Sequence, residues 1–380
     1  MTGTFTGRSP AAEASPEAPG LSEPSKGLTV VTKEPYCAET PLPELDTWVT
    51  PTERFFVRSH FPVPHLDVES WRLIVDGEVD HPLELSFADL MRERTRTVVT
   101  TMECAGNSRS SVYPPAQGVR WHHGALGTAR WSGVSLWDVI SKAEIRPAAI
   151  EAVFEGADHG REPGVPEELS YAMSVPIVKA EHPDTLLAFE MNGEPLTASH
   201  GFPVRVIVPG WYGMGSVKWV TRISLIDHSF RGFFRTKPYT FIHEGDDPDV
   251  LRKPVTSLQV KSVITWPPEG ATVAPGRIVV RGAAWSGEAA ISRVEVAVGL
   301  PDDSGEGGTW RPATLLGPET PHAWVRWEVP IDLERPGYFV LRCRATDERG
   351  DTQPLRAEWN FRGVANNSMH AVPLIVRRSA

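Results

Sequence analysis

Proline and glycine divide this sequence into short apolar runs, and that spacing restricts the chain to a strand-rich fold. The 380 residues include 35 Pro and 32 Gly, so few uninterrupted stretches are long enough for a helix. Many runs between them are rich in Val and other β-branched residues, which favour strands. Because a chain of this length exceeds one ordinary core, we expect two domains.

The clearest strand pattern lies in the C-terminal third. In the run Phe339–Ala345 the odd-numbered residues are apolar, and Arg342 and Arg344 fall between them. This alternation is typical of a strand with one buried face. Similar runs, such as Ile278–Val280 and Val294–Val298, recur between Pro, Gly and Asp turns. The pattern predicts an antiparallel β-sandwich of immunoglobulin type over residues 251–380.

Residues 28–250 have a mixed pattern that predicts an α+β domain. Two helices are expected, Phe87–Arg94 with Ser86 as its N-cap and Leu136–Ala143 after Ser135. The expected strands include Trp71–Val75, Arg96–Thr101, Ala152–Phe154 and Val204–Val208. Residues 1–27 are rich in Pro, Ala, Ser and Glu, and we expect them to be a disordered extension.

Charge and composition bear on partners and compartment. The formal net charge of -10 disfavours nucleic-acid binding, which requires a basic face. No apolar run reaches the roughly 18 residues of a membrane-spanning helix, so no membrane span is expected. The N-terminus has no apolar signal core, which favours the cytoplasm, or the periplasm if a signal has been removed.

The cysteines are Cys37, Cys104 and Cys343, and their odd number and wide spacing speak against a disulfide framework. No Cys-x-x-Cys pair occurs, so a zinc ribbon, an iron–sulfur cluster or covalently attached haem is not indicated. Cys343 falls on the apolar face of its run and is expected in the core. Cys37 lies in a Pro-flanked segment that we interpret as a loop without a role.

Cys104 is the main candidate for chemistry. It follows a β-like run, Thr97–Thr101, and opens a small, turn-prone segment in which Arg109 would favour the thiolate. A thiolate there could be a nucleophile or a soft metal ligand. A buried structural cysteine is nevertheless the commoner outcome for a lone Cys, so these neighbours alone leave the three alternatives open.

Residues 200–219 form a second candidate segment. His200 precedes a strand that contains Arg205, and a glycine-rich loop follows before Lys218. Backbone N–H groups of such a loop, together with Arg and Lys, suit an anion, although most glycine-rich turns are only turns.

Three further positions are weak signals by themselves. Arg58 and Arg362 each lie inside an apolar segment, where an edge-strand position or an ion pair is the commoner explanation. Asp158 precedes His159 in what reads as an ordinary loop.

Taken together and in this order, these segments resemble the sulfite oxidase family of molybdenum enzymes. The resemblance runs from about residue 55 to residue 376 and is strongest at Glu103–Asn107, His200–Gly210, Val217–Trp219 and Trp359–Val364. It implies a sulfite-oxidase-type molybdopterin-binding domain over residues 28–250. It also implies that the immunoglobulin-like residues 251–380 are a dimerisation domain.

The resemblance also implies roles for individual residues. It makes Cys104 the thiolate ligand of molybdenum, and it places Ser108 where animal members carry a second Arg. The implied catalytic residues are Cys104, Arg58, Arg109, Trp121, Tyr239 and Arg362. The implied cofactor-binding residues are Phe56, Val57, Arg58, Ser59, His60, Cys104, Asp158, His200, Arg205, Ser216, Val217 and Lys218.

The implied activity is the oxidation of sulfite to sulfate by a homodimer with a molybdenum–molybdopterin cofactor. Electrons would pass to a separate acceptor such as cytochrome c or oxygen. Three arginines in one pocket would draw in the small anion despite the acidic chain. Two alternatives stay open: a relative acting on another oxyanion or sulfur compound, like a nitrate reductase or a sulfane dehydrogenase, and a non-catalytic scaffold of the same fold.

Overall fold

The structure is a computed structural model that describes residues 27–243, 245–247, 252–301, 309–318 and 320–378. Strands dominate these residues, as the sequence predicts. The helices are short: even α2 (Leu136–Ile140) has only 5 residues. The predicted disordered extension lies outside the described residues, apart from Gly27. We call residues 27–243 the N-terminal part and residues 252–378 the C-terminal part.

Three sheets form the N-terminal part. The smallest has the order β1 (Thr29–Thr32), β2 (Cys37–Glu39) and β3 (Val57–Arg58). The second has the order β11 (Glu194–Pro195), β10 (Leu186–Met191), β7 (Leu126–Ser135) and β6 (Thr95–Glu103), with β12 (Arg205–Ile207) also paired to β10. The third has the order β5 (Leu83–Ser86), β4 (Arg72–Gly77), β13 (Val220–Ile226), β8 (Glu151–Gly160) and β9 (Leu169–Pro176). Buried apolar residues of the second and third sheets share one large core.

The predicted helix starts are confirmed. The Ser86 hydroxyl accepts a hydrogen bond from the Asp89 backbone N–H, and the Asp89 carboxylate accepts one from the Ser86 N–H, which is a capping box. This box begins α1 (Phe87–Leu90), which ends before the predicted Arg94 because β6 begins at Thr95. Ser135 caps α2 in a similar way. The other α-helices are α3 (Ile177–Ala180) and α4 (Phe233–Thr236).

Two sheets form the C-terminal part and face each other across one apolar core. One has the order β14 (Lys261–Trp266), β16 (Gly276–Trp285), β20 (Val325–Leu333) and β19 (Thr314–Leu316). The other has the order β15 (Thr272–Val273), β22 (His370–Val376), β21 (Gly337–Asp347), β17 (Ile291–Gly299) and β18 (Arg311–Pro312). Leu341, Cys343 and Ala345 are all buried in this core, so the predicted alternation is confirmed. We call these strands the C-terminal sandwich.

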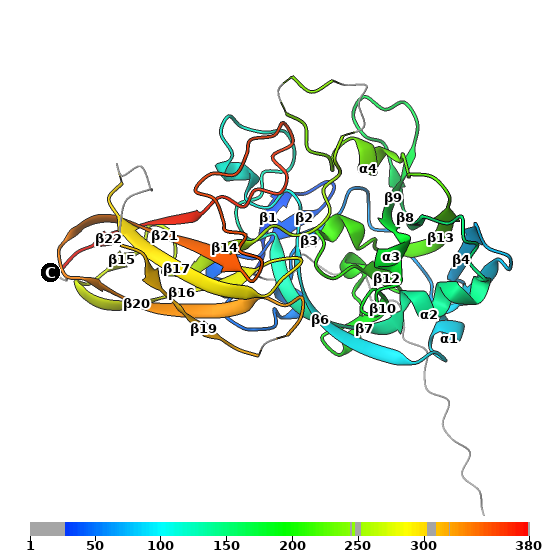
Figure 1. Cartoon of the computed structure of the whole chain (residues 1–380), viewed down its shortest axis with the longest axis horizontal. Coiled ribbons are helices and arrows are strands. Elements are labelled where there is room, and N and C mark those ends of the chain that lie inside the picture. The colour runs from blue at the N-terminus through cyan, green and yellow to red at the C-terminus, as the bar shows by residue number, and fades with distance from the viewer. Residues whose placement is uncertain (1–26, 244, 248–251, 302–308, 319, 379–380) are drawn as a thin grey trace, which may run out of the picture.

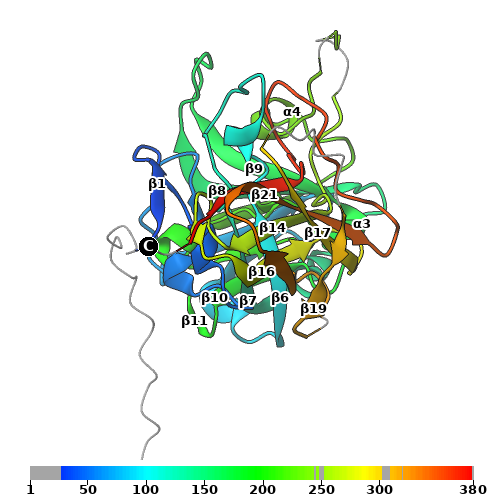
Figure 2. The ribbon, with the colours of Figure 1, turned by 90° about the vertical axis from the view of Figure 1, so that its left-hand side faces the viewer.

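The two parts lie side by side, and β6 runs close to their boundary (Figure 1). The C-terminal sandwich faces the viewer in Figure 2. A long segment before β22 returns to the N-terminal part, where the Ala365 N–H donates to the Ala105 carbonyl at 2.8 Å. The chain thus brings its C-terminal residues to the end of β6. None of the helices in the described ranges has the length and apolar character that crossing a bilayer requires.

Strand β21 allows a direct test of the two-sheet core. Leu341→Ala should lower the free energy of unfolding by about 2–5 kcal/mol, because the fully buried side chain leaves a cavity. Tyr338→Ala on the same strand should change it by less than about 0.5 kcal/mol, because Tyr338 is 68% exposed. Urea unfolding of both variants measures the difference, and equal losses would contradict the assigned faces.

Candidate active site

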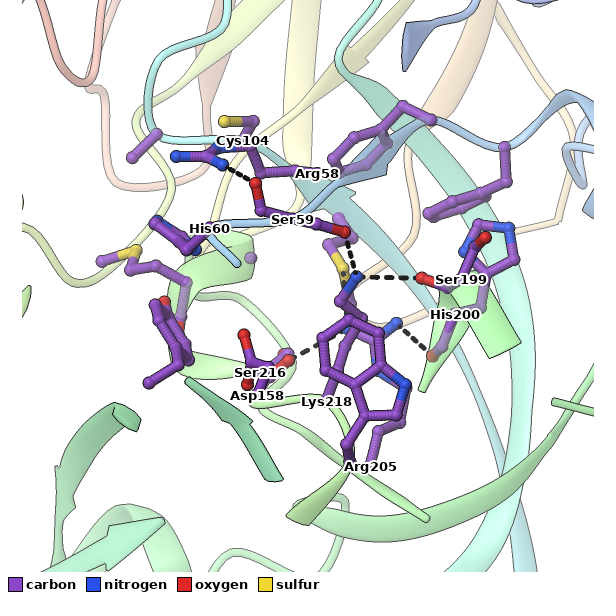
Figure 3. Close-up of a pocket in the computed structure, with 18 of the residues that line it drawn as sticks. Arg58, Ser59, His60, Cys104, Asp158, Ser199, His200, Arg205, Ser216 and Lys218 are labelled. Carbon is purple, nitrogen blue, oxygen red and sulfur yellow. Dashed lines mark hydrogen bonds between the residues drawn. The ribbon is translucent and has the colours of Figure 1, made fainter. Parts of the chain in front are cut away.

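A pocket of about 640 Å³ lies in the N-terminal part, between the end of β6, strand β3 and the segment around residues 199–219. It brings together many residues that the sequence predicts for one site. Those on its lining are Phe56, Arg58, Ser59, His60, Cys104, Asp158, His200, Arg205, Ser216, Lys218 and Tyr239. Figure 3 shows that side chains from distant parts of the chain converge there.

Cys104 follows the last residue of β6 and is 7% exposed. Its backbone N–H donates to the Ala125 carbonyl at 2.9 Å, and its own carbonyl accepts from the Asn107 N–H at 2.8 Å. The chain therefore turns sharply at Cys104, and the side chain lies on the pocket wall. Burial raises the pKa of the Cys104 thiol, while Arg58 opposes that shift. A metal that coordinates this sulfur would displace the proton.

Arg58 lies beside Cys104 at one end of the pocket (Figure 3). Arg58 belongs to β3, which is an edge strand of its sheet. This position agrees with the commoner explanation for an Arg inside an apolar segment. In register opposite it is Cys37, whose Sγ is 3.7 Å from the guanidinium. The interpretation of Cys37 as a loop residue is therefore wrong: it is a buried residue of β2, because pairing with β3 extends the strand. The Cys104 thiol and the Arg58 guanidinium together could hold a soft metal and a small anion.

Two buried cations, Arg205 and Lys218, lie at the other end of the pocket. Arg205 donates to the carbonyls of His200 and Ser216, both at 3.0 Å, and no described residue accepts from its Nε. Lys218 donates to the Ser199 carbonyl at 2.9 Å. Burial lowers the pKa of Arg205 to about 9, and burial together with Arg205 lowers that of Lys218 to about 7. The hydrogen bonds of both cations thus go to neutral atoms.

Asp158 lies near Lys218 on the same pocket wall. Its Oδ1 is buried and receives no hydrogen bond from the described residues. Burial raises the pKa of this carboxyl to about 6, although Lys218 opposes the shift. The interpretation of Asp158 as a loop residue is wrong, because β8 continues to Gly160 and pairs with β9 there. The pocket therefore offers one unpaired acceptor, Oδ1 of Asp158, and one unpaired donor, Nε of Arg205.

His60 and Tyr239 form a hydrogen-bonded pair between the two ends. His60 Nε2 and the Tyr239 hydroxyl are 2.6 Å apart, and the His60 ring stacks on Tyr171 with centroids 4.4 Å apart. Burial, with Arg58 and Lys218 nearby, holds the pKa of His60 well below its usual range. The imidazole is thus neutral, and the hydrogen bond holds the Tyr239 oxygen at this place in the pocket.

Five predicted site residues are not on the lining: Val57, Arg109, Trp121, Val217 and Arg362. Arg109 is buried, and its guanidinium donates to the carbonyls of Arg362 and Val119, both at 2.8 Å. Trp121 is fully buried in the apolar cluster that also contains Cys104. The structure therefore brings Arg58 to the pocket but does not bring the other two predicted arginines onto its surface.

Several lining residues were not predicted. Phe55, Ser199, Gly213, Met214 and Trp219 lie within or beside segments that the sequence already singles out, so proximity to those motifs could have found them. Met102 and Ala105 flank Cys104. Tyr171 carries no such signal, because it enters the pocket from the middle of β9.

A group of potential metal ligands lies away from the pocket. His182, Asp184 and His322 have ligand atoms within 4.8 Å of one another. The Asp184 backbone N–H donates to Nδ1 of His182 at 3.2 Å, so this nitrogen already has a hydrogen-bond partner. Asp184 also pairs with Arg96 at 3.4 Å and with His322 at 3.6 Å. The Asp184 carboxylate therefore already has a charged partner, Arg96, without a metal.

Comparison with known proteins agrees with this geometry. Residues 60–234 match the family described as oxidoreductase molybdopterin binding domain, and residues 252–377 match the Mo-co oxidoreductase dimerisation domain. The sulfite oxidase of Arabidopsis thaliana is 33% identical over 398 residues, which cover 94% of this chain and 98% of that protein. The chain belongs to the sulfite oxidase family.

Matches to two other proteins also cover most of this chain. The mitochondrial sulfite oxidase of Rattus norvegicus is 36% identical over 368 residues, or 91% of this chain, but the match spans only 65% of that protein. The solved structure of the sulfane dehydrogenase SoxCD from Paracoccus pantotrophus is similar with a TM-score of 0.77 and 29% identity, covering 95% of this chain and 89% of that one. The family resemblance inferred from sequence is thus confirmed.

The pocket of this sulfite oxidase family member fits the molybdenum–molybdopterin cofactor. A pterin carries N–H groups that suit the unpaired Oδ1 of Asp158. Its phosphate would give Arg205 and Lys218 the anionic partner that their present hydrogen bonds lack. The Cys104 sulfur on the opposite wall is a soft ligand suited to the metal. Each unpaired group therefore has a counterpart in the cofactor.

The buried His200 predicts a pH dependence of stability. Burial lowers its pKa from the usual 6.5 to about 3, so between these values the unfolded chain binds a proton that the folded chain does not. Stability should therefore fall as the pH drops below about 6.5, with His200 contributing about 2 kcal/mol between pH 7 and pH 5. Urea unfolding at both pH values should show a smaller loss for His200→Gln, whereas the exposed control His81→Gln should keep the wild-type loss.

Proposed function

We propose that this chain oxidises sulfite to sulfate with a molybdenum–molybdopterin cofactor held in the pocket, and that the electrons pass to a separate acceptor such as cytochrome c or oxygen. The observation that carries the proposal is that the Cys104 sulfur and the Arg58 guanidinium lie beside each other on the pocket wall. A soft ligand beside a cation can bind a metal and an anion at the same place.

Cys104 is the proposed metal ligand in this scheme. When bound, the molybdenum centre supplies oxygen transfer and accepts two electrons from the substrate. Arg205 and Lys218 would hold the phosphate of the cofactor, and Asp158 would accept from the pterin. The remaining proposed cofactor-binding residues are Phe56, Val57, Arg58, Ser59, His60, His200, Ser216 and Val217.

Arg58 is the proposed sulfite ligand, because a guanidinium matches two oxygens of a small oxyanion. Tyr239, whose hydroxyl is bonded to His60, would place a neutral O–H beside the same anion. Arg109 would act through its electric field, because its guanidinium lies against Gly106, two residues after Cys104. A Cβ added at Gly106 would lie only 2.4 Å from that guanidinium. Arg362 is held near Arg109 by its carbonyl, and Trp121 supplies an apolar wall that excludes water.

The same proposal includes an immunoglobulin-like architecture for the C-terminal part and a homodimer formed by the chain. Its sheets of four and five strands around one core support an immunoglobulin-like sandwich. The match to a dimerisation domain supports a homodimer.

A sulfur compound other than sulfite is the second candidate substrate. The likeness to the sulfane dehydrogenase SoxCD supports it, because the structural match covers 95% of this chain. The proposed pocket chemistry serves either substrate, since both reactions oxidise sulfur.

The full chain, produced in a host that makes the cofactor, tests the proposed function. Elemental analysis should find molybdenum, and sulfite should reduce ferricyanide or cytochrome c in a steady-state assay. Turnover of a sulfane substrate without sulfite turnover would favour the second candidate. A fully metallated chain that oxidises neither compound would rule out both candidates, whereas a chain without molybdenum from such a host would favour the non-catalytic scaffold.

Cys104→Ser should abolish sulfite turnover while the chain still folds, because a hard hydroxyl replaces the soft thiolate. Activity and thermal unfolding check the two parts of this expectation, and molybdenum content shows whether the variant still holds the metal. Cys343→Ser is the matched control, because Cys343 is equally a buried cysteine but lies in the C-terminal sandwich. It should lose stability and keep kcat, and a comparable loss of kcat in both variants would contradict the role of Cys104.

Arg58→Met should chiefly raise KM for sulfite, by about ten- to a hundredfold, because it removes a charged hydrogen bond to the bound anion. The exposed control Arg277→Met should leave KM unchanged. Steady-state kinetics at several sulfite concentrations separate KM from kcat. An unchanged KM in Arg58→Met would place Arg58 outside the substrate site.

A further inference from the structure

A buried polar network outside the pocket joins the residue before Cys104 to the C-terminal sandwich. The Glu103 carboxylate lies 2.6 Å from Nζ of Lys261, the first residue of β14, and both side chains are at most 2% exposed. Nε1 of Trp285, the last residue of β16, donates to the other carboxylate oxygen at 2.9 Å. Asn107 donates to Glu103 at 3.0 Å. Three donors from two parts of the chain thus converge on one carboxylate.

Stability alone does not explain this ion pair. Removing two charges from water costs several kcal/mol, and well-packed apolar residues in their place are often as stable. Lys261 donates a second hydrogen bond to the Ser108 hydroxyl at 3.0 Å, so one ammonium group contacts both ends of the same turn. A network of this kind instead fixes one geometry, since its members are satisfied only in one arrangement.

The rest of the turn is held from the same side. We call residues 103–109 the Cys104 turn. The Ala105 carbonyl accepts from the Ala365 N–H at 2.8 Å, and the Ser108 carbonyl accepts from Nδ2 of Asn366 at 2.9 Å. Ser108 has a left-handed φ of 68°, which these contacts support. The C-terminal part therefore contacts Glu103, Ala105 and Ser108, on both sides of Cys104 in the turn. The Cys104 sulfur itself lines the pocket.

We propose that Lys261 and Trp285 are positioning residues that, through Glu103, aim the Cys104 sulfur into the pocket. The C-terminal sandwich then completes the metal site of its own chain, in addition to any role in dimerisation. This inference rests on the proposed function in one respect, namely that Cys104 is the metal ligand. It assigns a part in cofactor geometry to residues that lie 158 and 182 positions after Glu103 in the sequence.

Trp285→Phe is the variant that tests it, because it removes one donor to Glu103 and keeps most of the ring in the core. The chain also offers a matched control. Trp327 is equally buried in the same sheet, and its Nε1 donates to the Ser262 hydroxyl at 3.0 Å, away from the Cys104 turn. Both substitutions remove one buried indole hydrogen bond, so a purely structural role would make their effects alike.

Two measurements separate positioning from stability. In the full chain without cofactor, mass spectrometry follows the alkylation of Cys104 by iodoacetamide, which should be faster in Trp285→Phe because the turn moves more freely. In the holoenzyme, kcat should fall by about tenfold with KM little changed, as is typical when a partner of a metal ligand is lost. Trp327→Phe should have the wild-type rate of alkylation and the wild-type kcat, while its melting temperature should be similar to that of Trp285→Phe.

Equal changes in the two Trp variants, or wild-type behaviour of Trp285→Phe, would overturn the proposal. If Trp285→Phe does not fold, the double variant Glu103→Gln with Lys261→Met removes the ion pair without leaving a lone charge, and it should give the same two results. Failure of the wild-type holoenzyme to oxidise sulfite would instead count against the proposed function. The alkylation comparison would still decide the positioning role.

Discussion

The ion pair between Glu103 and Lys261 links the two parts of the molecule at the residue before Cys104. Strand β6 delivers Cys104 to the pocket, and the C-terminal part contacts the turn that follows. Because both charges are buried, the two parts must pack in one relative position for the pair to be satisfied. The geometry of the pocket wall therefore depends on the packing of the C-terminal sandwich as well as on the N-terminal sheets.

Within the pocket, the dominant physical feature is positive charge in an acidic protein. The chain has a formal net charge of -10, yet Arg58, Arg205 and Lys218 all line one buried space. Burial lowers the pKa of Arg205 and Lys218, which means that their charged forms are costly without an anion. A cofactor phosphate beside Arg205 and Lys218 would relieve this cost, and Arg58 at the other end would remain available to a small oxyanion.

Much of this arrangement could be predicted from local sequence signals. Alternation identified the buried face of β21, and Ser86 and Ser135 identified two helix starts. The grouping of the site residues came from the family resemblance, because no local pattern relates Cys104 to Lys218. Cys37 and Asp158 were misread as loop residues because their strands are set by pairing with β3 and β9. Lys261 gave no signal, since its partner lies 158 residues away.

The central claim is that the Cys104 sulfur binds molybdenum in the full chain. X-ray absorption at the molybdenum edge tests it most directly, because it counts the sulfur neighbours of the metal. Wild-type protein should show one more sulfur ligand than Cys104→Ser loaded with the same cofactor, and Cys343→Ser should match the wild type. Identical sulfur coordination in wild type and Cys104→Ser would contradict the account.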